Sequence, residues 1–169
     1  MASRGSSSGF TSAGAGAQPF GPPLIGALLR MPWEVVQRRM LEHLHERGFD
    51  DFDVAHLIVF QYPGPHGARP SELADRLRIS KQALGYLLGQ LEQRGYLDRR
   101  PHPDDQRGKR IVLTRRGKRA VGVIRDAVRE VEGAWTQQLG RERFAQLRAL
   151  LVELDQVSQS QSAAIQDPR

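Results

Sequence analysis

The sequence of 169 residues contains no cysteine. This excludes disulfides, thiolate metal sites and cysteine-based redox sensing. It also lacks any run of about 18 or more apolar residues, the length that a membrane-spanning helix requires, so we expect no membrane contact. Residues 1–21 lack the basic start and apolar run of a signal peptide, and we therefore expect a cytoplasmic protein.

Bulky apolar side chains are also scarce in residues 1–21, which are rich in Gly, Ser and Ala. Burial of so little apolar surface cannot offset the entropy lost on ordering, so we expect a disordered N-terminal arm. Residues 22–160 are predicted to form a single domain, since domains run roughly 100–200 residues. The polar residues 158–169 are predicted to fray as a tail.

Positive charge is concentrated in one part of the chain, although the net charge of the whole is only +6. The segment from Arg69 to Arg119 has fourteen basic and six acidic residues, an excess of eight positive charges, whereas the remainder is slightly acidic. An excess confined to one segment favours a surface that binds a polyanion, because each neutralised phosphate releases condensed counterions. The alternative is a basic surface that only aids solubility.

Helices are predicted at both ends of the domain, within residues 22–48 and 115–157, from apolar residues at helical spacing. Gly48 ends the first helix, Thr114 caps the next, and Gly140 divides the second region into two helices. Each apolar stripe must be buried somewhere. We expect burial against the same helices of a second copy, in an obligate two-fold homodimer. A monomeric helical cap is the alternative.

Residues 52–114 between these regions predict a DNA-binding lobe. A short helix from Phe52 is followed by a helix from Pro70 to about Leu77 and by a leucine-rich helix that Ser80 caps. Two short apolar runs then flank an Arg-rich, Pro- and Gly-bounded tip, as in a hairpin. The predicted fold class is mainly α (α+β): a winged helix-turn-helix lobe with a helical dimerisation region built from the N- and C-terminal helices.

The helix after Ser80 has a core-facing leucine stripe and an opposite face that we predict to contact DNA. Gln82 can pair with adenine, and Lys81 can reach guanine or phosphate. Gly costs a helix roughly 1 kcal/mol relative to Ala, so two outward glycines indicate close approach to a groove wall, unless they are merely tolerated surface residues. The candidate contact residues are Ser80, Lys81, Gln82, Gly85, Tyr86 and Gly89.

The hairpin provides the second set of candidate DNA contacts, Asp105, Arg107, Lys109 and Arg110. Asp105 and Arg107 are two residues apart, so in a hairpin arm they project to the same side. The carboxylate can then orient the guanidinium for insertion into a narrow, strongly negative minor groove. The alternative is an exposed ion pair of little energetic value.

Four groups of motifs follow one another along this lobe, and their order is more specific than any one of them. They are Leu73-Ala74-Asp75-Arg76-Leu77 with Ser80-Lys81-Gln82-Ala83-Leu84, Leu91-Glu92-Gln93-Arg94-Gly95-Tyr96-Leu97, Asp105-Gln106-Arg107, and Leu113-Thr114-Arg115-Arg116-Gly117. Together, over residues from about 22 to 157, they resemble the MarR family of multiple-antibiotic-resistance regulators. The resemblance implies a winged helix-turn-helix homodimer on pseudo-palindromic double-stranded DNA, usually a repressor and often released by a small phenolic or aromatic acid.

By position, the helix from Ser80 to Arg94 resembles the family's recognition helix, and Arg107 with Asp105 resembles the wing tip. The chain departs from the commoner wing pattern at Gln106, where a second Arg is frequent. Gly85 and Tyr86 also stand where the family often has small polar or basic residues. The resemblance therefore does not specify the operator sequence, the regulated genes or the effector.

Other chemistry is weakly supported by the sequence. His43 and His45 point about 200° apart on a helix and cannot grip one ion, although Glu42 shares a face with His45. A solvated helix face is the simpler interpretation, and we predict no metal site and no cofactor. No Ser–His–Asp ordering, phosphate-cradling loop or zinc signature is present, so we predict that the protein is not an enzyme.

Four aromatic residues are candidates for an effector pocket: Trp33, Phe60, Tyr62 and Trp135. Ligand sites are mostly apolar with a few polar anchors, but such residues are more often plain core. The sequence thus predicts a dimeric, sequence-specific transcriptional regulator, with a small aromatic ligand as a candidate effector. The alternative is a winged-helix protein–protein interaction module without specific DNA binding.

Overall fold

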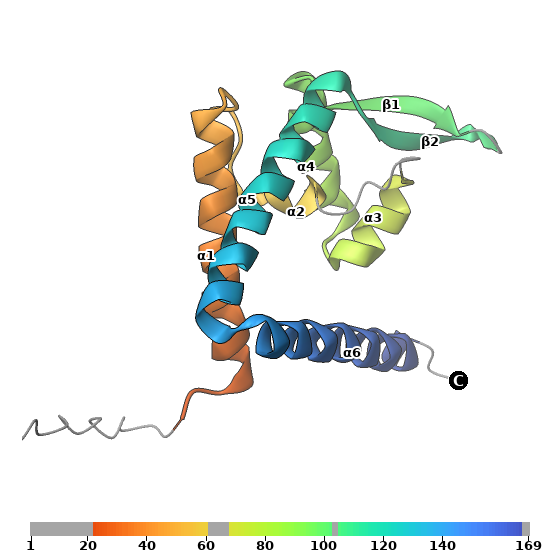
Figure 1. The fold of residues 1–169 in the computed structure, drawn as a ribbon. Coiled ribbons are helices and arrows are strands. Elements are labelled where there is room, and N and C mark those ends of the chain that lie inside the picture. Colours follow the sequence, from red (N-terminus) through yellow and green to blue (C-terminus); the bar gives the residue numbers. More distant parts are fainter. Residues whose placement is uncertain (1–21, 61–67, 103–104, 167–169) are drawn as a thin grey trace, which may run out of the picture.

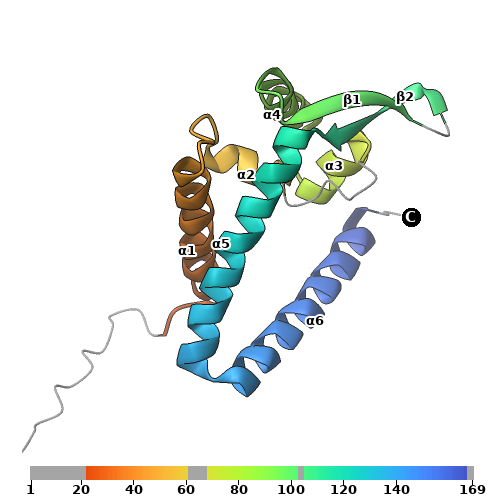
Figure 2. The same cartoon turned by 45° about the horizontal axis from the view of Figure 1, so that its top comes forward.

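The computed structural model describes residues 22–60, 68–102 and 105–166, with the backbone alone described at 102, 105–108 and 161–166. The expected disordered arm at residues 1–21 lies outside this range. Within it, two long helices, α1 (Ile25–Glu46) and α5 (Arg115–Leu139), lie side by side as a stem (Figures 1 and 2). Thr114 accepts a hydrogen bond from Gly117 N–H at the start of α5, as predicted for a cap.

The two stem helices are joined by apolar packing and by ion pairs. Met40 and Leu44 of α1 are buried, as are the small residues Ala120 and Ala127 of α5, which let the backbones approach closely. On the surface, Glu130 accepts from the guanidinium of Arg39 (Nη2–Oε1 2.7 Å) and contacts His43 (3.0 Å). These contacts lower the pKa of Glu130, chiefly through the hydrogen bond from Arg39.

Three short helices form the lobe beside the upper part of the stem: α2 (Val54–Phe60), α3 (Pro70–Leu77) and α4 (Lys81–Gln93) (Figure 1). Pro70 occupies the first turn of α3, where its missing N–H costs nothing. Between α3 and α4 the chain reverses through Arg78, which has left-handed backbone angles (φ 52°, ψ 39°). Ser80 then caps α4 by accepting from Ala83 N–H at 3.1 Å, as predicted.

The predicted hairpin is present as β1 (Leu97–His102) and β2 (Asp105–Leu113), paired antiparallel. Arg99 lies opposite Ile111, and the register shifts between Pro101 and His102 near the tip. Ala68 pairs with Ile111 through two backbone hydrogen bonds of 3.2 and 2.8 Å, which hold the segment before α3 against the base of the hairpin. The hairpin extends outward from the lobe (Figure 1).

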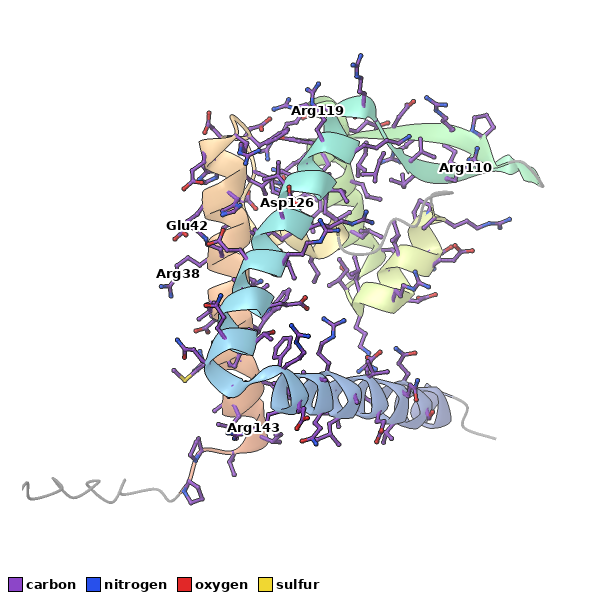
Figure 3. The ribbon with its side chains drawn as sticks, viewed as in Figure 1. Arg38, Glu42, Arg110, Arg119, Asp126 and Arg143 are labelled. Atoms are coloured by element: carbon purple, nitrogen blue, oxygen red, sulfur yellow. The ribbon has the colours of Figure 1, made fainter. Side chains whose placement is uncertain are left out.

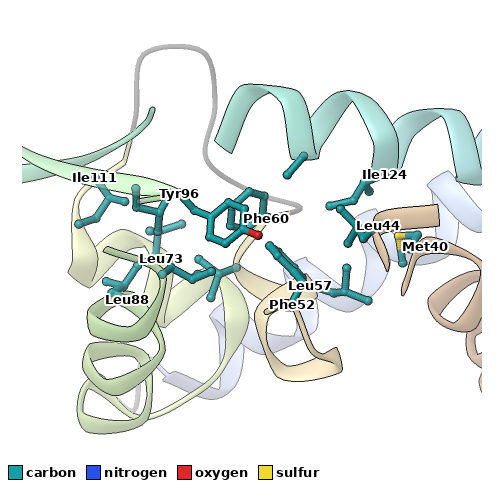
Figure 4. Packing of buried hydrophobic residues seen from close by; sticks show 14 of the residues in the cluster. Met40, Leu44, Phe52, Leu57, Phe60, Leu73, Leu88, Tyr96, Ile111 and Ile124 are labelled. Atoms are coloured by element: carbon teal, nitrogen blue, oxygen red, sulfur yellow. The ribbon is translucent and has the colours of Figure 1, made fainter. Parts of the chain in front are cut away.

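The core runs from the stem into the lobe, as the close view in Figure 4 shows. At its centre Tyr96 is fully buried and meets Phe52 and Phe60 edge-to-face, with ring centroids 5.1 and 5.8 Å apart. Aromatic pairs in this geometry contribute about 0.5–1.5 kcal/mol beyond their area. Leu84, Leu88 and Leu91, the core-facing stripe of α4, pack into the same cluster.

The C-terminal helix α6 (Arg141–Gln166) follows Gly140, whose positive φ of 84° ends α5 and redirects the chain. We expected fraying from Ser158, but the helix continues to Gln166. The reason lies in local hydrogen bonds: the hydroxyl of Ser158 donates to the Leu154 carbonyl, and Gln159 donates to Asp155 at 2.7 Å. Figures 1 and 2 show α6 leaving the stem, away from α1.

The expected fold class is confirmed: the described residues form six helices and one two-stranded antiparallel sheet, in the winged helix-turn-helix order. Among these residues, no helix combines the length and the apolar character needed to cross a membrane.

Candidate nucleic-acid interface

The outward face of α4 is open in the structure. Lys81, Gln82 and Gly85 are exposed, and Tyr86 keeps 68% of its surface accessible although it is a large aromatic residue. A Cβ added at Gly85 or Gly89 would meet nothing within 4 Å, so neither glycine is required by packing within the chain. The face is therefore smooth and free to receive another molecule.

The opposite side of α4 is fixed by the core, which sets the direction of this face. Leu84, Leu88 and Leu91 are each at most 2% exposed. Ser80 is one of the predicted DNA contacts, and its oxygen is engaged as the helix cap. A hydroxyl can still donate while it accepts, so capping and a DNA contact are compatible at this residue.

Basic residues flank this face on the hairpin and at the start of α5. Arg99 and Arg100 are anchored at their guanidinium groups by Glu92 (3.0 Å) and Asp98 (3.1 Å). Lys109 is exposed on β2, and Arg110 is half-buried there (labelled in Figure 3). At the start of α5 the exposed basic residues are Arg115, Lys118 and Arg119.

The predicted wing pair lies only partly within the described structure. Asp105 and Arg107 are placed in β2 by their backbone, two residues apart on one strand, and their side chains lie outside the described part. The proposed orientation of Arg107 by Asp105 therefore stays a prediction.

A buried polar cluster joins the lobe to the stem, and the sequence reasoning did not find it. Arg116 donates to both carboxylate oxygens of Asp51 (2.9 and 3.1 Å), and its guanidinium lies 4.3 Å over the ring of Tyr96. The Tyr96 hydroxyl donates to the same carboxylate. Burial, followed by the hydrogen bond and charge of Asp51, raises the pKa of Tyr96, so the phenol stays protonated.

This cluster fixes the start of α5 against the lobe. Arg116 also donates to the carbonyl of Arg94 at the end of α4 (2.6 Å), and Thr114 donates to the carbonyl of Gly95. Gly117 has the Tyr96 carbonyl 2.1 Å from where a Cβ would lie, so no larger residue fits there. The sequence signal available was Arg116-Gly117 itself, but its partner Asp51 is 65 residues away.

A second missed residue is His56, which is fully buried under α4. Its Nε2 lies 3.0 Å from the side-chain oxygen of Gln90, and the amide nitrogen of Gln90 donates to the Tyr86 hydroxyl at 3.0 Å. Tyr86 and Gln90 are four residues apart, the spacing at which helix side chains meet. That spacing could have indicated their contact, whereas nothing local indicated His56.

The four residues of the predicted effector pocket are not gathered in this chain. Phe60 packs on Tyr96 near the start of α5, whereas Trp135 packs on Phe144 near its end (centroids 6.5 Å apart). Arg116 and Trp135 are 19 residues apart on one helix, which corresponds to roughly 28 Å. Trp33 is 40% exposed on α1, and Tyr62 lies outside the described residues.

The histidines of α1 are engaged by the protein itself. His45 Nε2 is 3.0 Å from the Phe52 carbonyl, and His43 pairs with Glu130. Across residues 22–60, 68–101 and 109–160, no three His, Asp or Glu side chains are grouped so as to hold a metal ion.

Comparison with known proteins identifies the type of this lobe. Residues 51–108 match the model of the MarR family. None of the curated protein sequences matches the chain.

Solved structures share the fold over most of the chain. The transcriptional regulator Tm0710 from Thermotoga maritima is 26% identical, over 82% of this chain and 96% of that one, with a TM-score of 0.54. Wild-type MarR from E. coli in its apo form is 24% identical, over 79% and 97%, with a TM-score of 0.60. A mutant of E. coli MarR complexed with operator DNA is 24% identical, over 77% and 92%, with a TM-score of 0.61.

Proposed function

The chain is a MarR-type winged-helix protein, and on that premise we propose that it is a sequence-specific DNA-binding transcriptional regulator that acts as a homodimer. The observation that carries the proposal is the outward face of α4: Tyr86 is exposed beside glycines with open space around them. Such a helix enters the major groove, and a basic hairpin beside it contacts the flanking backbone or minor groove. We assign the DNA contacts to Ser80, Lys81, Gln82, Gly85, Tyr86 and Gly89, and in the wing to Asp105, Arg107, Lys109 and Arg110.

The excess positive charge supports DNA over another partner. Arg115, Lys118 and Arg119 extend the basic surface from the hairpin onto α5. In the mutant of MarR from E. coli, whose fold is similar, the complex is with operator DNA. A protein–protein interaction module would not require this distribution of charge.

The homodimer is proposed from apolar surface that one chain leaves uncovered. On α6 the exposed residues include Leu150 (62%), Leu154 (43%) and Val157 (52%), and on α1 they include Ile25 (66%) and Leu28 (51%). Apolar surface of this extent on two helices indicates an interface. A two-fold pair would place two α4 helices on successive turns of duplex DNA.

Selection from a random duplex pool with the purified protein tests the proposal. We expect enrichment of a pseudo-palindrome whose half-sites lie about one helical turn apart. Affinity for the selected site should fall by about 10³-fold or more between 50 and 200 mM salt if roughly six to ten phosphates are contacted. No enrichment, together with salt-independent capture of proteins, would favour the interaction module instead.

The wing assignment has its own test. Replacing Arg107 with Ala should reduce affinity, chiefly for sites with A·T-rich flanks, because their narrow minor groove attracts an inserted Arg. The measurement is fluorescence anisotropy on two duplexes that share the selected core and differ only in their flanks. Equal loss on both duplexes would assign Arg107 to the phosphates instead.

We further propose that binding represses transcription and that a small aromatic acid releases it. Such an effector would favour a spacing of the two α4 helices that misfits one turn of DNA. Because one chain separates Phe60 from Trp135, a shared pocket would need residues of both copies. Titrating salicylate into the protein–operator complex tests this: release reports an aromatic-acid site, and unchanged anisotropy at millimolar ligand contradicts it.

A further inference from the structure

Four groups connect the buried end of α2 to the exposed face of α4: the Asp53 backbone N–H, the His56 ring, the Gln90 amide and the Tyr86 hydroxyl. Successive donor–acceptor distances are 3.1, 3.0 and 3.0 Å. His56 is fully buried and Tyr86 is 68% exposed, so this Asp53–Tyr86 series runs from the core to the surface. The DNA contacts assigned above do not explain why a buried histidine is there.

The direction of the series is set at its buried end. A backbone N–H can only donate, so the Asp53 N–H makes His56 Nδ1 an acceptor. A neutral imidazole with Nδ1 unprotonated carries its proton on Nε2. The Asp53 side chain in turn accepts from the N–H groups of Ala55 and His56, which gives the reciprocal pattern of a capping box and fixes the ring.

The same direction then passes through Gln90. With Nε2–H of His56 donating, the Gln90 atom that faces it must be the oxygen, and the amide nitrogen must face Tyr86. The guanidinium of Arg94, which can only donate, lies 3.3 Å from Nδ1 and is consistent with that nitrogen as an acceptor. The Tyr86 oxygen therefore accepts from Gln90, and its own O–H proton is left to point outward.

Nδ1 also lies 3.1 Å from the carboxylate oxygen of Asp53. A second proton on the ring would be held there, and Nε2 would remain a donor. Only a neutral ring with the proton on Nδ1 alone would reverse the series, and it would leave the Asp53 N–H without its acceptor.

We propose that His56 and Gln90 are positioning residues that make Tyr86 a hydrogen-bond donor toward DNA. This inference rests on the DNA-binding function proposed above and specifies the chemistry of one contact. Tyr86 donates its O–H to an acceptor on the duplex, which is either a phosphate oxygen or an acceptor on a base edge in the major groove. Holding the phenol in advance reduces the entropy lost on binding.

The first experiment uses the full-length protein and its selected duplex. Tyr86→Phe keeps the ring and removes the donor, and we expect affinity to fall about tenfold. Gln90→Met keeps the length of the side chain and removes the support, with an expected loss of about threefold. The double variant should bind no more weakly than Tyr86→Phe alone, because Gln90 acts only through the hydroxyl. Gln93→Met, the same change one turn along the exposed surface of α4, is the control and should leave affinity unchanged.

A scrambled duplex of equal length identifies the acceptor. Loss on Tyr86→Phe for both duplexes assigns a phosphate oxygen, and loss for the selected duplex alone assigns a base. If the wild-type protein binds its site and Tyr86→Phe binds it equally well, the inference is wrong and the DNA-binding function stands. If the wild-type protein binds no duplex, the function itself is wrong.

Nitrogen-15 NMR of the labelled histidines gives a readout that does not depend on DNA. We expect the resonances of His56 to show a proton on Nε2, assigned by comparison with a His56→Gln variant. A ring with its proton on Nδ1 alone would make Tyr86 an acceptor and overturn the inference. Thermal unfolding of each variant confirms that it is folded at the temperature of the binding measurements.

Discussion

The two ends of α5 lie in contrasting surroundings. At its start, Gly117, Ala120 and Ile124 are buried against the lobe and α1, and Arg116 is bound to Asp51. Beyond its end, α6 has exposed leucines and valines along its length, with only Phe144 half-buried among residues 141–160. One region is complete within a single chain, and the other is not.

The difference shows which part of the molecule can fold alone. The lobe encloses an aromatic centre around Tyr96, and its buried His56 has hydrogen-bond partners. Helix α6 has a helical stripe of the right kind for a core but nothing in the chain covers it. We therefore expect substitutions in the lobe to change folding and substitutions in α6 to change assembly.

The largest effect should come from charges on α6. Replacing Leu150 and Leu154 together with Glu places two carboxylates on the proposed interface in each copy. Each buried leucine contributes at least about 1.5 kcal/mol, so the dimer should lose roughly 6 kcal/mol or more. Analytical ultracentrifugation should show monomers with an intact circular dichroism spectrum for the lobe.

Gln156→Glu adds a carboxylate on the other side of α6 and serves as the control. It should leave the dimer intact. A wild-type protein that sediments as a single chain would remove the comparison and the dimer with it.

The next largest effect should come from a methyl group inside the lobe. Gly117→Ala brings a Cβ to 2.1 Å from the Tyr96 carbonyl, which is backbone and cannot move aside. We expect the free energy of unfolding to fall by about 3 kcal/mol, measured by denaturant titration. Gly122→Ala, on the same helix with nothing within 4 Å, should instead raise it by about 0.5–1 kcal/mol. Equal effects at both sites would contradict the packing described here.

A third glycine separates folding from DNA binding. Gly89 has open space around it, so Gly89→Val should leave stability unchanged or slightly higher. The added side chain should hold α4 away from the groove wall and weaken operator binding by about tenfold or more, near 1.4 kcal/mol. Anisotropy titrations beside denaturant titrations give both values, and unchanged affinity would refute our account of the glycine.

The smallest effect concerns the exposed ion pair of the stem. The pKa of Glu130 is lowered in the folded protein, so the unfolded chain takes up a proton first as pH falls. Its stabilising contribution is therefore full above the ordinary value of 4.5 and is lost as pH drops through the lowered pKa. Glu130→Gln should be less stable than wild type at pH 7, and the difference should shrink by about pH 3. A constant difference across this range would contradict an electrostatic role.

Local signals predicted most of the elements correctly. Ser80 and Thr114 cap α4 and α5, and Gly140 ends α5, because capping depends on residues within one turn. The fraying expected from Ser158 was wrong, since side-chain hydrogen bonds along α6 continue the helix. For the candidate site, the leucine periodicity of α4 predicted its outward face, and Tyr86 on that face is exposed.

The sequence by itself determined the helices, the hairpin and the concentration of positive charge, because periodicity, capping residues and composition act over short distances. Only the tertiary structure decided that Arg116 meets Asp51 and that His56 supports Gln90. These partners are 65 and 34 residues apart, and no local pattern specifies such pairs. Their contacts form when the core of the lobe closes and brings distant side chains into a low-dielectric interior, where unpaired polar groups are costly.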